Sequence, residues 1–439
     1  MDRRELLRRA GLAAAAMPLA SRAWALPAGQ ADARFLLVFL RGGYDANSLL
    51  VPTGSDFYYA SRPTIAIKRP VAEGGTPDPQ AAIALPGDGA SGWGLHPSVA
   101  ERLLPFWRQG QLAFVPFAGT DDLSRSHFET QDSIEAGLPI PGDRSAPGSA
   151  AAALRGSGFL NRLASTLGAQ AAPVAFTDVL PASMAGPAAI PNVSLKGSLR
   201  APFDERQSAV YAGMYRGSRF SSVLAEGLEL RQTVAQEVEA EAARQRDRSS
   251  AMAADPAMAA RMQEMQAASR QAISARGFEL EARRMAQLMR ERYTLGFIDV
   301  GGWDTHVNQG GAQGQLANLL QNLGSGLATF AQELGPAWDR TVVVVVSEFG
   351  RTFRENGTRG TDHGHGSAYW VAGGGLRGGR LAGEQAVLRP GALNQDRDFP
   401  VLNEYRAVIG GLLRRQYGLD AVQLARIFPG SAPLDLGLL

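Results

Sequence analysis

Two apolar runs constrain the fold of this 439-residue chain more than any other feature. Residues 342–346 are five consecutive valines that follow Thr341, and Arg34–Leu40 is almost entirely apolar. Apolar runs without alternation, rich in β-branched residues, are typical of strands buried on both faces of a parallel sheet. Weaker strand candidates are Gln111–Phe117, Pro173–Phe176 and Leu295–Val300. The sequence therefore predicts a mostly parallel sheet.

Helical patterns lie between these strand candidates. Six apolar residues recur at helical spacing and would share one face: Leu316, Leu319, Leu320, Leu323, Leu327 and Phe330. Pro97–Trp107 also has a helical pattern, with proline at its first position. Because strands alternate with helices, we predict an α/β chain with a three-layer α/β/α fold over residues 26–439.

Two segments interrupt this alternation. Residues 141–158 are rich in Gly, Ala, Ser and Pro, which predicts a surface loop. Residues 221–292 are rich in Ala, Glu, Arg, Gln and Met, and Pro256 is a natural point for a helix to restart. We therefore predict an inserted helical element of two or three helices at about 221–292. It is either a solvated cover or a cap over an active site.

The first 25 residues have the features of a targeting signal rather than of a folded segment. Arg3 and Arg4 precede a short apolar run, Ala10–Ala20, which is followed by Ala23-Trp24-Ala25. This arrangement resembles a twin-arginine signal peptide with an A-x-A cleavage site. A run of about 11 residues is too short to cross a bilayer, for which ~20 are needed. We expect the twin-arginine machinery to export the folded chain to the periplasm; an uncleaved anchor is the alternative.

Charge and composition exclude several classes of function. The net charge is +2, but residues 1–25 hold five Arg against one Asp and one Glu, so the rest of the chain stands at −1. Such a balance does not indicate binding to nucleic acid or to an anionic membrane, and no transmembrane segment is expected after the signal. The chain has no Cys, so a metal would be held by His, carboxylate, amide or hydroxyl groups.

The five histidines are the most informative polar residues: His96, His127, His306, His363 and His365. Each lies in a short segment dense in Gly, Asp or Ser. His96 directly precedes Pro97, so we expect it to cap a helix or to form a hydrogen bond rather than to bind a metal.

Two of these segments combine histidine with aspartate. Asp304 and His306 follow the strand candidate Leu295–Val300, and residues 360–366 read GTDHGHG. Imidazole and carboxylate together suit zinc and manganese, and glycines let ligands approach closely. For either segment alone a hydrogen-bonded turn is the alternative. Their joint occurrence beyond apolar strands, where open α/β sheets bind ligands, favours a metal site.

Seven short segments rich in Gly, Asp or His follow one another along the chain. They are Arg41–Asp45, Leu95–Pro97, Ser126–Phe128 with Gln131 and Asp132, Gly302–His306 with Gln309, Ser347–Thr352, Asn356-Gly357, and Thr361–Gly364. Together they resemble a bacterial family of exported proteins known only as a domain of unknown function. The resemblance covers nearly the whole chain after the signal. That family is similar in fold to the alkaline phosphatase and sulfatase superfamily, which implies an alkaline-phosphatase-like domain.

The resemblance implies catalytic roles near the start of a helix. Ser126 matches the superfamily's nucleophile, which stands at a helix N-terminus where free N–H groups favour a phosphate or sulfate. Arg125 would be an added anion donor, and His127 completes the set of catalytic candidates. The alternative for Ser126 is a helix cap.

The resemblance also implies a set of metal ligands. Asp45 matches the acid at the end of the first strand, Asp304 and His306 match a later pair, and Glu348 follows the valine strand. A final His-Gly loop is matched by His363 or His365. The expected ligands are Asp45, Asp304, His306, Glu348, Asp362, His363 and His365. Zinc is the expected ion, with manganese, calcium and magnesium as alternatives; Glu348 and Arg351 could instead form a buried ion pair.

Two departures from the superfamily pattern bear on this site. Asp304 and His306 are two residues apart, whereas related phosphatases space the pair four apart. Phe349 stands where a second-site histidine is expected, and phenylalanine cannot bind a metal. These departures leave two alternatives to a site with two zinc ions. One is a site with a single metal ion, and the other is a harder ion held by Asp45, Glu348 and Asp304.

The resemblance leads to two functional hypotheses. The first is an exported metal-dependent hydrolase that acts on phosphate or sulfate esters of a small molecule or a glycan. The second is a non-catalytic envelope protein that uses a degraded metal site to bind a ligand, a glycan or a partner protein.

Overall fold

A computed structural model describes residues 32–87, 89–139, 154, 156–195, 205–218, 220–229, 273–274 and 277–439. The predicted signal peptide and most of the loop predicted at 141–158 lie outside these residues. Within the described part of the chain, no helix is long and apolar enough to cross a membrane.

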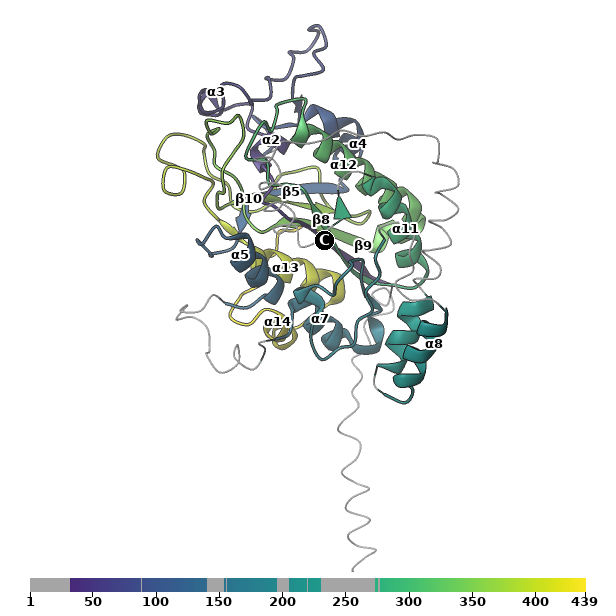
Figure 1. Ribbon diagram of the computed structural model, residues 1–439. Coiled ribbons are helices and arrows are strands. Elements are labelled where there is room, and N and C mark those ends of the chain that lie inside the picture. Colours follow the sequence, from purple (N-terminus) through teal and green to yellow (C-terminus); the bar gives the residue numbers. More distant parts are fainter. Residues whose placement is uncertain are drawn as a thin grey trace, which may run out of the picture.

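An eight-stranded sheet forms the centre of the molecule (Figure 1). Its strands are β1 (Arg34–Leu40), β5 (Leu112–Gly119), β6 (Pro173–Ala175), β7 (Ile273–Ser274), β8 (Leu295–Gly301), β9 (Thr341–Ser347), β10 (Ser367–Ala372) and β11 (Asn403–Glu404). Their order is β11-β5-β10-β9-β1-β8-β6, and β7 also pairs with β8. β10 is antiparallel to both of its neighbours, and the other pairings described are parallel. The mostly parallel sheet is confirmed.

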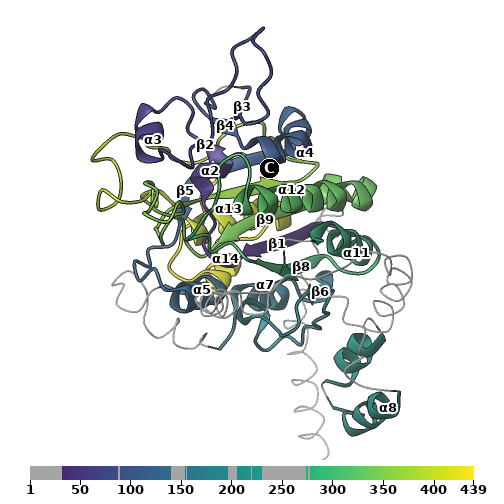
Figure 2. The same cartoon turned by 45° about the horizontal axis from the view of Figure 1, so that its top comes forward.

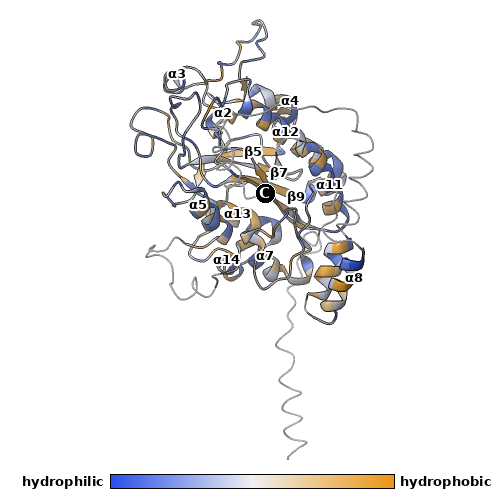
Figure 3. Cartoon of the chain, in the orientation of Figure 1, coloured by the Kyte–Doolittle hydropathy of each residue, from blue (hydrophilic) through white to orange (hydrophobic). Residues whose placement is uncertain are grey.

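The central strands are buried on both faces, as their composition predicts. Leu36, Val38 and Leu40 of β1 pack into one core cluster, and Phe35, Leu37 and Phe39 pack into another on the opposite face. All six side chains are fully buried. Burying a side chain of this size contributes roughly 1.5–3 kcal/mol. Figure 3 shows the central strands as the most hydrophobic part of the chain, with helices of mixed character around them.

Helices cover both faces of the sheet (Figure 2). One core cluster contains residues of α4 (Pro97–Arg108), α11 (Phe278–Glu291) and α12 (Gln315–Leu334). The other contains residues of α5 (His127–Ala136), α7 (Phe159–Leu167), α13 (Tyr405–Tyr417) and α14 (Ala421–Ile427). The three-layer α/β/α prediction is therefore confirmed.

Shorter elements surround this core. A second sheet has the order β2-β4-β3, with β2 (Leu50–Val51), β3 (Ile83–Ala84) and β4 (Gly94–Leu95). The remaining elements are α2 (Ala46–Leu49), α3 (Asp56–Ser61), α8 (Glu205–Met214) and the 3-10 turns η1 (Gly168–Gln170), η2 (Ala182–Met184) and η3 (Gly335–Arg340).

The helical insertion predicted at 221–292 is described only at its two ends. Residues 221–229 are helical and lie near α8 at one side of the molecule (Figure 1), and residues 230–272 are outside the described part. At the other end, β7 joins the sheet and α11 packs on α12, with Phe278, Met285 and Met289 fully buried. α11 thus belongs to the core layer. Its polar face gave it the composition of a surface helix.

The topology positions the segments that carry the polar motifs. β1, β5, β8 and β9 run in the same direction, so their carboxyl ends meet at one edge of the sheet. Residues 41–45, 120–127, 302–306 and 348–366 follow these ends. Open α/β sheets bind ligands at this edge.

Candidate metal centre

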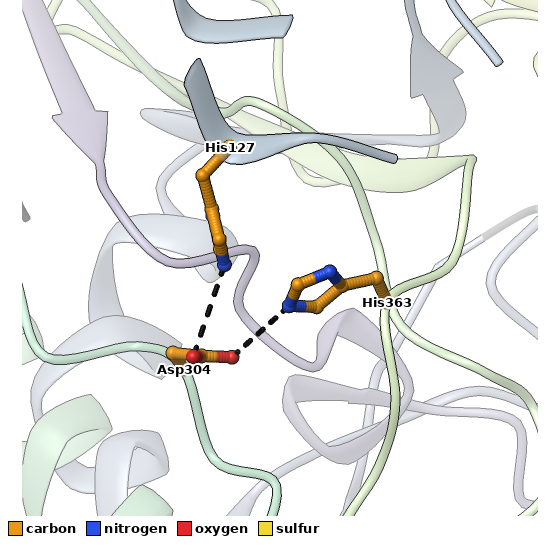
Figure 4. A group of neighbouring side chains, drawn as sticks. All are labelled: His127, Asp304 and His363. Atoms are coloured by element: carbon orange, nitrogen blue, oxygen red, sulfur yellow. Dashed lines mark ion pairs between the residues drawn. The ribbon is translucent and has the colours of Figure 1, made fainter. Parts of the chain in front are cut away.

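Three histidines and one aspartate converge at the carboxyl edge of the sheet. His127 is the first residue of α5, Asp304 and His306 follow β8, and His363 lies between β9 and β10. Figure 4 shows His127 and His363 directed toward Asp304 from two different segments.

The distances between their polar atoms suit a bound cation. His306 Nε2 lies 3.0 Å from both His363 Nε2 and Asp304 Oδ1, and His363 Nε2 lies 3.4 Å from Asp304 Oδ1. His127 Nε2 is 3.8 Å from Asp304 Oδ2. In the described part of the chain, His127, Asp304 and His363 form the one group whose ligand atoms all lie within 4.8 Å of one another. His306 lies beside this group, with its Nε2 3.0 Å from two of the members. Ligands around a tetrahedral zinc ion, with bonds of about 2.0–2.1 Å, lie roughly 3.3 Å apart.

The second ring nitrogen of each histidine is held by an acceptor. His127 Nδ1 lies 2.8 Å from Glu348 Oε1, and His306 Nδ1 lies 3.0 Å from Asp362 Oδ1. His363 Nδ1 lies 3.1 Å from the carbonyl oxygen of Arg125. Such outer partners fix the ring orientation and are typical of histidines that bind metals. They leave Nε2 of each ring as the atom that faces Asp304.

One of these inner nitrogens lacks a hydrogen-bond partner. Nε2 of His127 is buried and unpaired, which is costly in a protein interior unless a ligand satisfies it. In addition, Nε2 atoms of His306 and His363 face each other at 3.0 Å, where two lone pairs repel unless a cation or a proton lies between them. The donor set therefore fits a divalent metal of the zinc class.

The electrostatics of the group favour positive charge at its centre. Burial raises the pKa of Asp304, but the three neighbouring histidines and the charge of Arg351 hold it far below its usual value. Burial likewise raises the pKa of Glu348, yet the hydrogen bond and charge of His127 hold it at about 2. Burial lowers the pKa of His127, but Asp304 and Glu348 raise it to about 9. Without a metal, both carboxylates are thus ionised around a protonated His127, whose positive charge a bound metal ion would replace.

The backbone must approach closely for this group to form. Gly42 has a φ of +124°, and a Cβ built on it would lie 2.6 Å from the backbone nitrogen of Asp304. Any side chain at this position would displace the segment that carries Asp304. The glycine after β1 is therefore required by the packing at the sheet edge.

Comparison with protein families adds an assignment. The model of a family described as "Protein of unknown function (DUF1501)" matches residues 32–428. The chain belongs to this family. The matched DUF1501 region includes every residue of the metal group, and membership in a family of unknown function is as predicted. No curated protein matches the chain.

Asp45, expected as a metal ligand in this DUF1501 chain, lies in a separate buried ion pair. Arg62 bonds both of its oxygens, at 2.5 and 2.9 Å, and Ser48 and Gln309 donate to Oδ2. The Gln309 amide oxygen in turn accepts from Thr305 and from the hydroxyl of Thr361. Asp45 therefore supports the segments that carry Asp304 and Asp362 and does not contact the metal group.

Three further predicted ligands lie around the group rather than in it. Glu348 and Asp362 each contact a histidine of the group through its Nδ1. His365 is buried, and the charged groups that act on it include Asp398 and Arg125. The predicted pair of Glu348 and Arg351 is not formed. Arg351 pairs with Asp304, because Glu348 already accepts from His127, Gln131, Ser347 and the Gly42 N–H.

The two residues before His127 have structural contacts of their own. The Ser126 hydroxyl caps α5 by accepting from the Glu129 N–H at 3.5 Å. Arg125 has a φ of +53°, and its guanidinium bonds Gln395 at 2.9 Å and pairs with Asp398 at 3.1 Å. Arg125 therefore contacts the metal group through its carbonyl oxygen, on His363.

His96 has the role predicted for it. Its Nδ1 accepts from the Ser98 N–H at the start of α4, and its Nε2 lies 3.1 Å from the Gly311 carbonyl oxygen. Burial lowers its pKa to about 4.

The sequence did not assign His127 to the metal group. It was a catalytic candidate because of its neighbour Ser126, and no carboxylate beside it suggested a ligand. The signal that was available is Gln131, one helical turn later, which the structure brings to the same Glu348 oxygen as His127.

Proposed function

We propose that this chain is a metal-dependent hydrolase of phosphate or sulfate esters, with one zinc-class ion held by His127, His306, His363 and Asp304. The observation that carries the proposal is the group of His127, His363 and Asp304, with His306 Nε2 3.0 Å from two of its members and each histidine Nδ1 held by its own acceptor. Hydrolysis on an alkaline-phosphatase-like fold is the function that the resemblance of the seven segments implies.

A divalent ion in such a group supplies Lewis acidity toward an ester oxygen. The residues differ in what they offer a substrate. His127 and Asp304 are 7% and 6% exposed in their side chains, whereas His306 and His363 are 34% and 23% exposed. The ester would therefore approach across His306 and His363, while His127 and Asp304 hold the ion from within.

Ser126 is the nucleophile in this proposal. It precedes His127 at the N-terminus of the ten-residue helix α5, where the helix dipole favours an anion. Arg125 supports anion binding because its Nε is buried without a hydrogen-bond partner. Its pairing with Asp398 means that it would position a phosphate or sulfate by hydrogen bonds more than by net charge.

The second candidate function is ligand binding without catalysis at the envelope. Two contacts favour it. The Ser126 hydroxyl is already used as a helix cap, and Asp304 already bonds the Arg351 guanidinium. In this case the metal group would hold a ligand, a glycan or a partner protein. Export to the periplasm by the twin-arginine route is proposed for either function.

Metal analysis of the purified chain, joined to an ester hydrolysis panel, tests the proposal. We expect one zinc-class ion per chain and turnover of a phosphate or sulfate monoester. His363→Asn and Asp304→Asn should lose both. His365→Asn is the matched control, because this histidine lies two residues from His363 but outside the group, and it should retain the metal.

Each alternative result has a definite meaning. A parent chain without bound metal contradicts the metal centre. A chain that binds one ion and hydrolyses none of the phosphate and sulfate esters supports the binding role instead. If His365→Asn loses the metal and His363→Asn keeps it, the ligand is His365 and the proposed role of His363 is wrong.

A further inference from the structure

A chain of buried hydrogen bonds leads from β1 to the metal group. Arg41, just after β1, donates to the Gln131 side-chain oxygen at 2.9 Å. The Gln131 amide donates to Glu348 Oε1 at 2.9 Å, and the same oxygen lies 2.8 Å from His127 Nδ1. All four side chains are 7% exposed or less. His127 and Gln131 are four residues apart on α5, so they face the strand end together.

The direction of each hydrogen bond in this series follows from Arg41, where the series begins. An arginine can only donate, so Gln131 turns its carbonyl oxygen toward Arg41 and its amide group toward Glu348. Glu348 therefore accepts, as it also does from the Gly42 N–H at 2.7 Å and from the Ser347 hydroxyl at 2.9 Å. The remaining partner of Oε1, His127 Nδ1, must then be a donor. When His127 is neutral, as a metal-binding histidine must be, Nε2 is left with a free lone pair.

We propose that Glu348 is the positioning residue of the metal centre: oriented by Arg41 and Gln131, it fixes His127 as the Nδ1–H tautomer and directs Nε2 toward the ion. The inference rests on the proposed metal-dependent function and adds to it. Glu348 was expected to bind the metal directly. Its Oε1 instead accepts three hydrogen bonds and its Oε2 accepts one, so it acts through His127.

Arg41, the first residue of this series of hydrogen bonds, is held rigidly. Arg41 Nε bonds Asp299 at 2.6 Å, and its second terminal nitrogen pairs with Glu135 at 2.9 Å. Three fixed partners hold the guanidinium at the end of β1, so the side chain of Gln131 has one favourable orientation. The position of the metal-facing nitrogen is thus set from the sheet and not from the loop before α5.

Two substitutions of Glu348 separate positioning from charge. Glu348→Gln keeps the reach of the side chain and an oxygen that accepts from Nδ1, but loses the charge. Glu348→Asp keeps the charge but is one methylene shorter. If Glu348 positions His127, zinc affinity falls about 10–100-fold in Glu348→Asp and much less in Glu348→Gln. If Glu348 acts as a ligand or through its charge, the order is reversed.

The tautomer is read directly by NMR of metal-free protein labelled with ¹⁵N-histidine, recorded at a pH above the His127 pKa of about 9, where the ring is neutral. The chain has only five histidines, and a purification tag without histidine keeps the spectrum simple. His127, assigned by its loss in His127→Asn, should show Nδ1–H in the parent and in Glu348→Gln, and a mixture of tautomers in Glu348→Asp. Glu135→Gln and Glu135→Asp are matched controls, because Glu135 is also buried and pairs with Arg41, which Asp299 and Gln131 still hold in these variants.

The outcomes distinguish this inference from the proposed function. A parent that binds no zinc contradicts the proposed function. A parent that binds zinc, with Glu348→Asp unchanged in affinity and in the His127 signals, overturns the positioning role. Equal losses in the Glu135 and Glu348 variants also overturn it, because they would reflect the general cost of altering a buried acid.

Discussion

Arg351 joins three segments of the metal centre through one guanidinium. It is almost fully buried and donates to the carbonyl oxygens of Gly42, Gly43 and Thr361, and it pairs with Asp304. All of these partners lie at the carboxyl edge of the sheet. The planar guanidinium offers five N–H donors in a fixed geometry, whereas the ammonium of lysine offers three at a single nitrogen.

Arg351→Lys should therefore destabilise the chain although it keeps the charge. We expect a loss of about 3 kcal/mol in the free energy of unfolding, because the substitution leaves buried acceptors without donors and weakens a buried ion pair. Urea denaturation followed by circular dichroism measures it. The control is Arg354→Lys at a half-exposed pair with Asp396, which should leave the midpoint almost unchanged. Equal midpoints for both variants would contradict the buried network.

Residue types predicted part of the candidate site and not the rest. The histidines beside Asp304 and Asp362 were visible because their partners are close in sequence. The role of Asp45 was not, because Arg62 lies 17 residues away and its guanidinium could have paired elsewhere. The contact of Glu348 with Gln131 spans 217 residues, and only the fold brings these two together.

Among the elements, the buried parallel strands were the easiest to predict. β1 and β9 are long apolar runs, and the observed bounds of these two strands and of β8 differ from the predicted ones by at most one residue. β10 was not predicted. It is six residues long, lies between a Gly- and His-rich loop and three glycines, and owes its strand conformation to pairing with β5 and β9. Such pairing is a tertiary effect that a short segment does not reveal.

The N-terminus of α5 allows the two roles of Ser126 to be separated. Ser126→Ala removes the cap and the hydroxyl together, and it should cost about 1 kcal/mol of stability and all ester turnover. Ser126→Asn keeps a capping oxygen, so it should retain stability and still lack turnover. Thermal unfolding and ester hydrolysis are measured on both variants. If Ser126→Asn hydrolyses esters at the parental rate, Ser126 is a helix cap and not the nucleophile.

At the scale of the whole molecule, the residues of the candidate metal centre meet only in the folded chain. His363 and Arg125, which touch at the centre, are 238 residues apart. The ligands come from α5, from the end of β8 and from the loop before β10, so the sheet must form before they meet. This dependence agrees with an export route that carries folded proteins.

Replacing Arg3 and Arg4 by Lys should leave the precursor in the cytoplasm. The twin-arginine machinery recognises the arginine pair, and lysine keeps the charge without the guanidinium. Cell fractionation and immunoblotting of precursor and mature forms measure the effect. Normal periplasmic yield of the variant, or of the parent in a strain without twin-arginine transport, would contradict this route.

Assembly of the proposed centre from distant segments would also determine when its ion is chosen. Before folding, Asp304 and His306 are the only proposed ligands near one another in sequence, and two ligands select poorly among divalent ions. Selection would therefore take place in the compartment where the sheet closes, from the ions supplied there. A chain folded in the cytoplasm would take its ion from a pool that the cell regulates and carry it outward. The same chain folded in the periplasm would compete for whatever ions the surroundings provide.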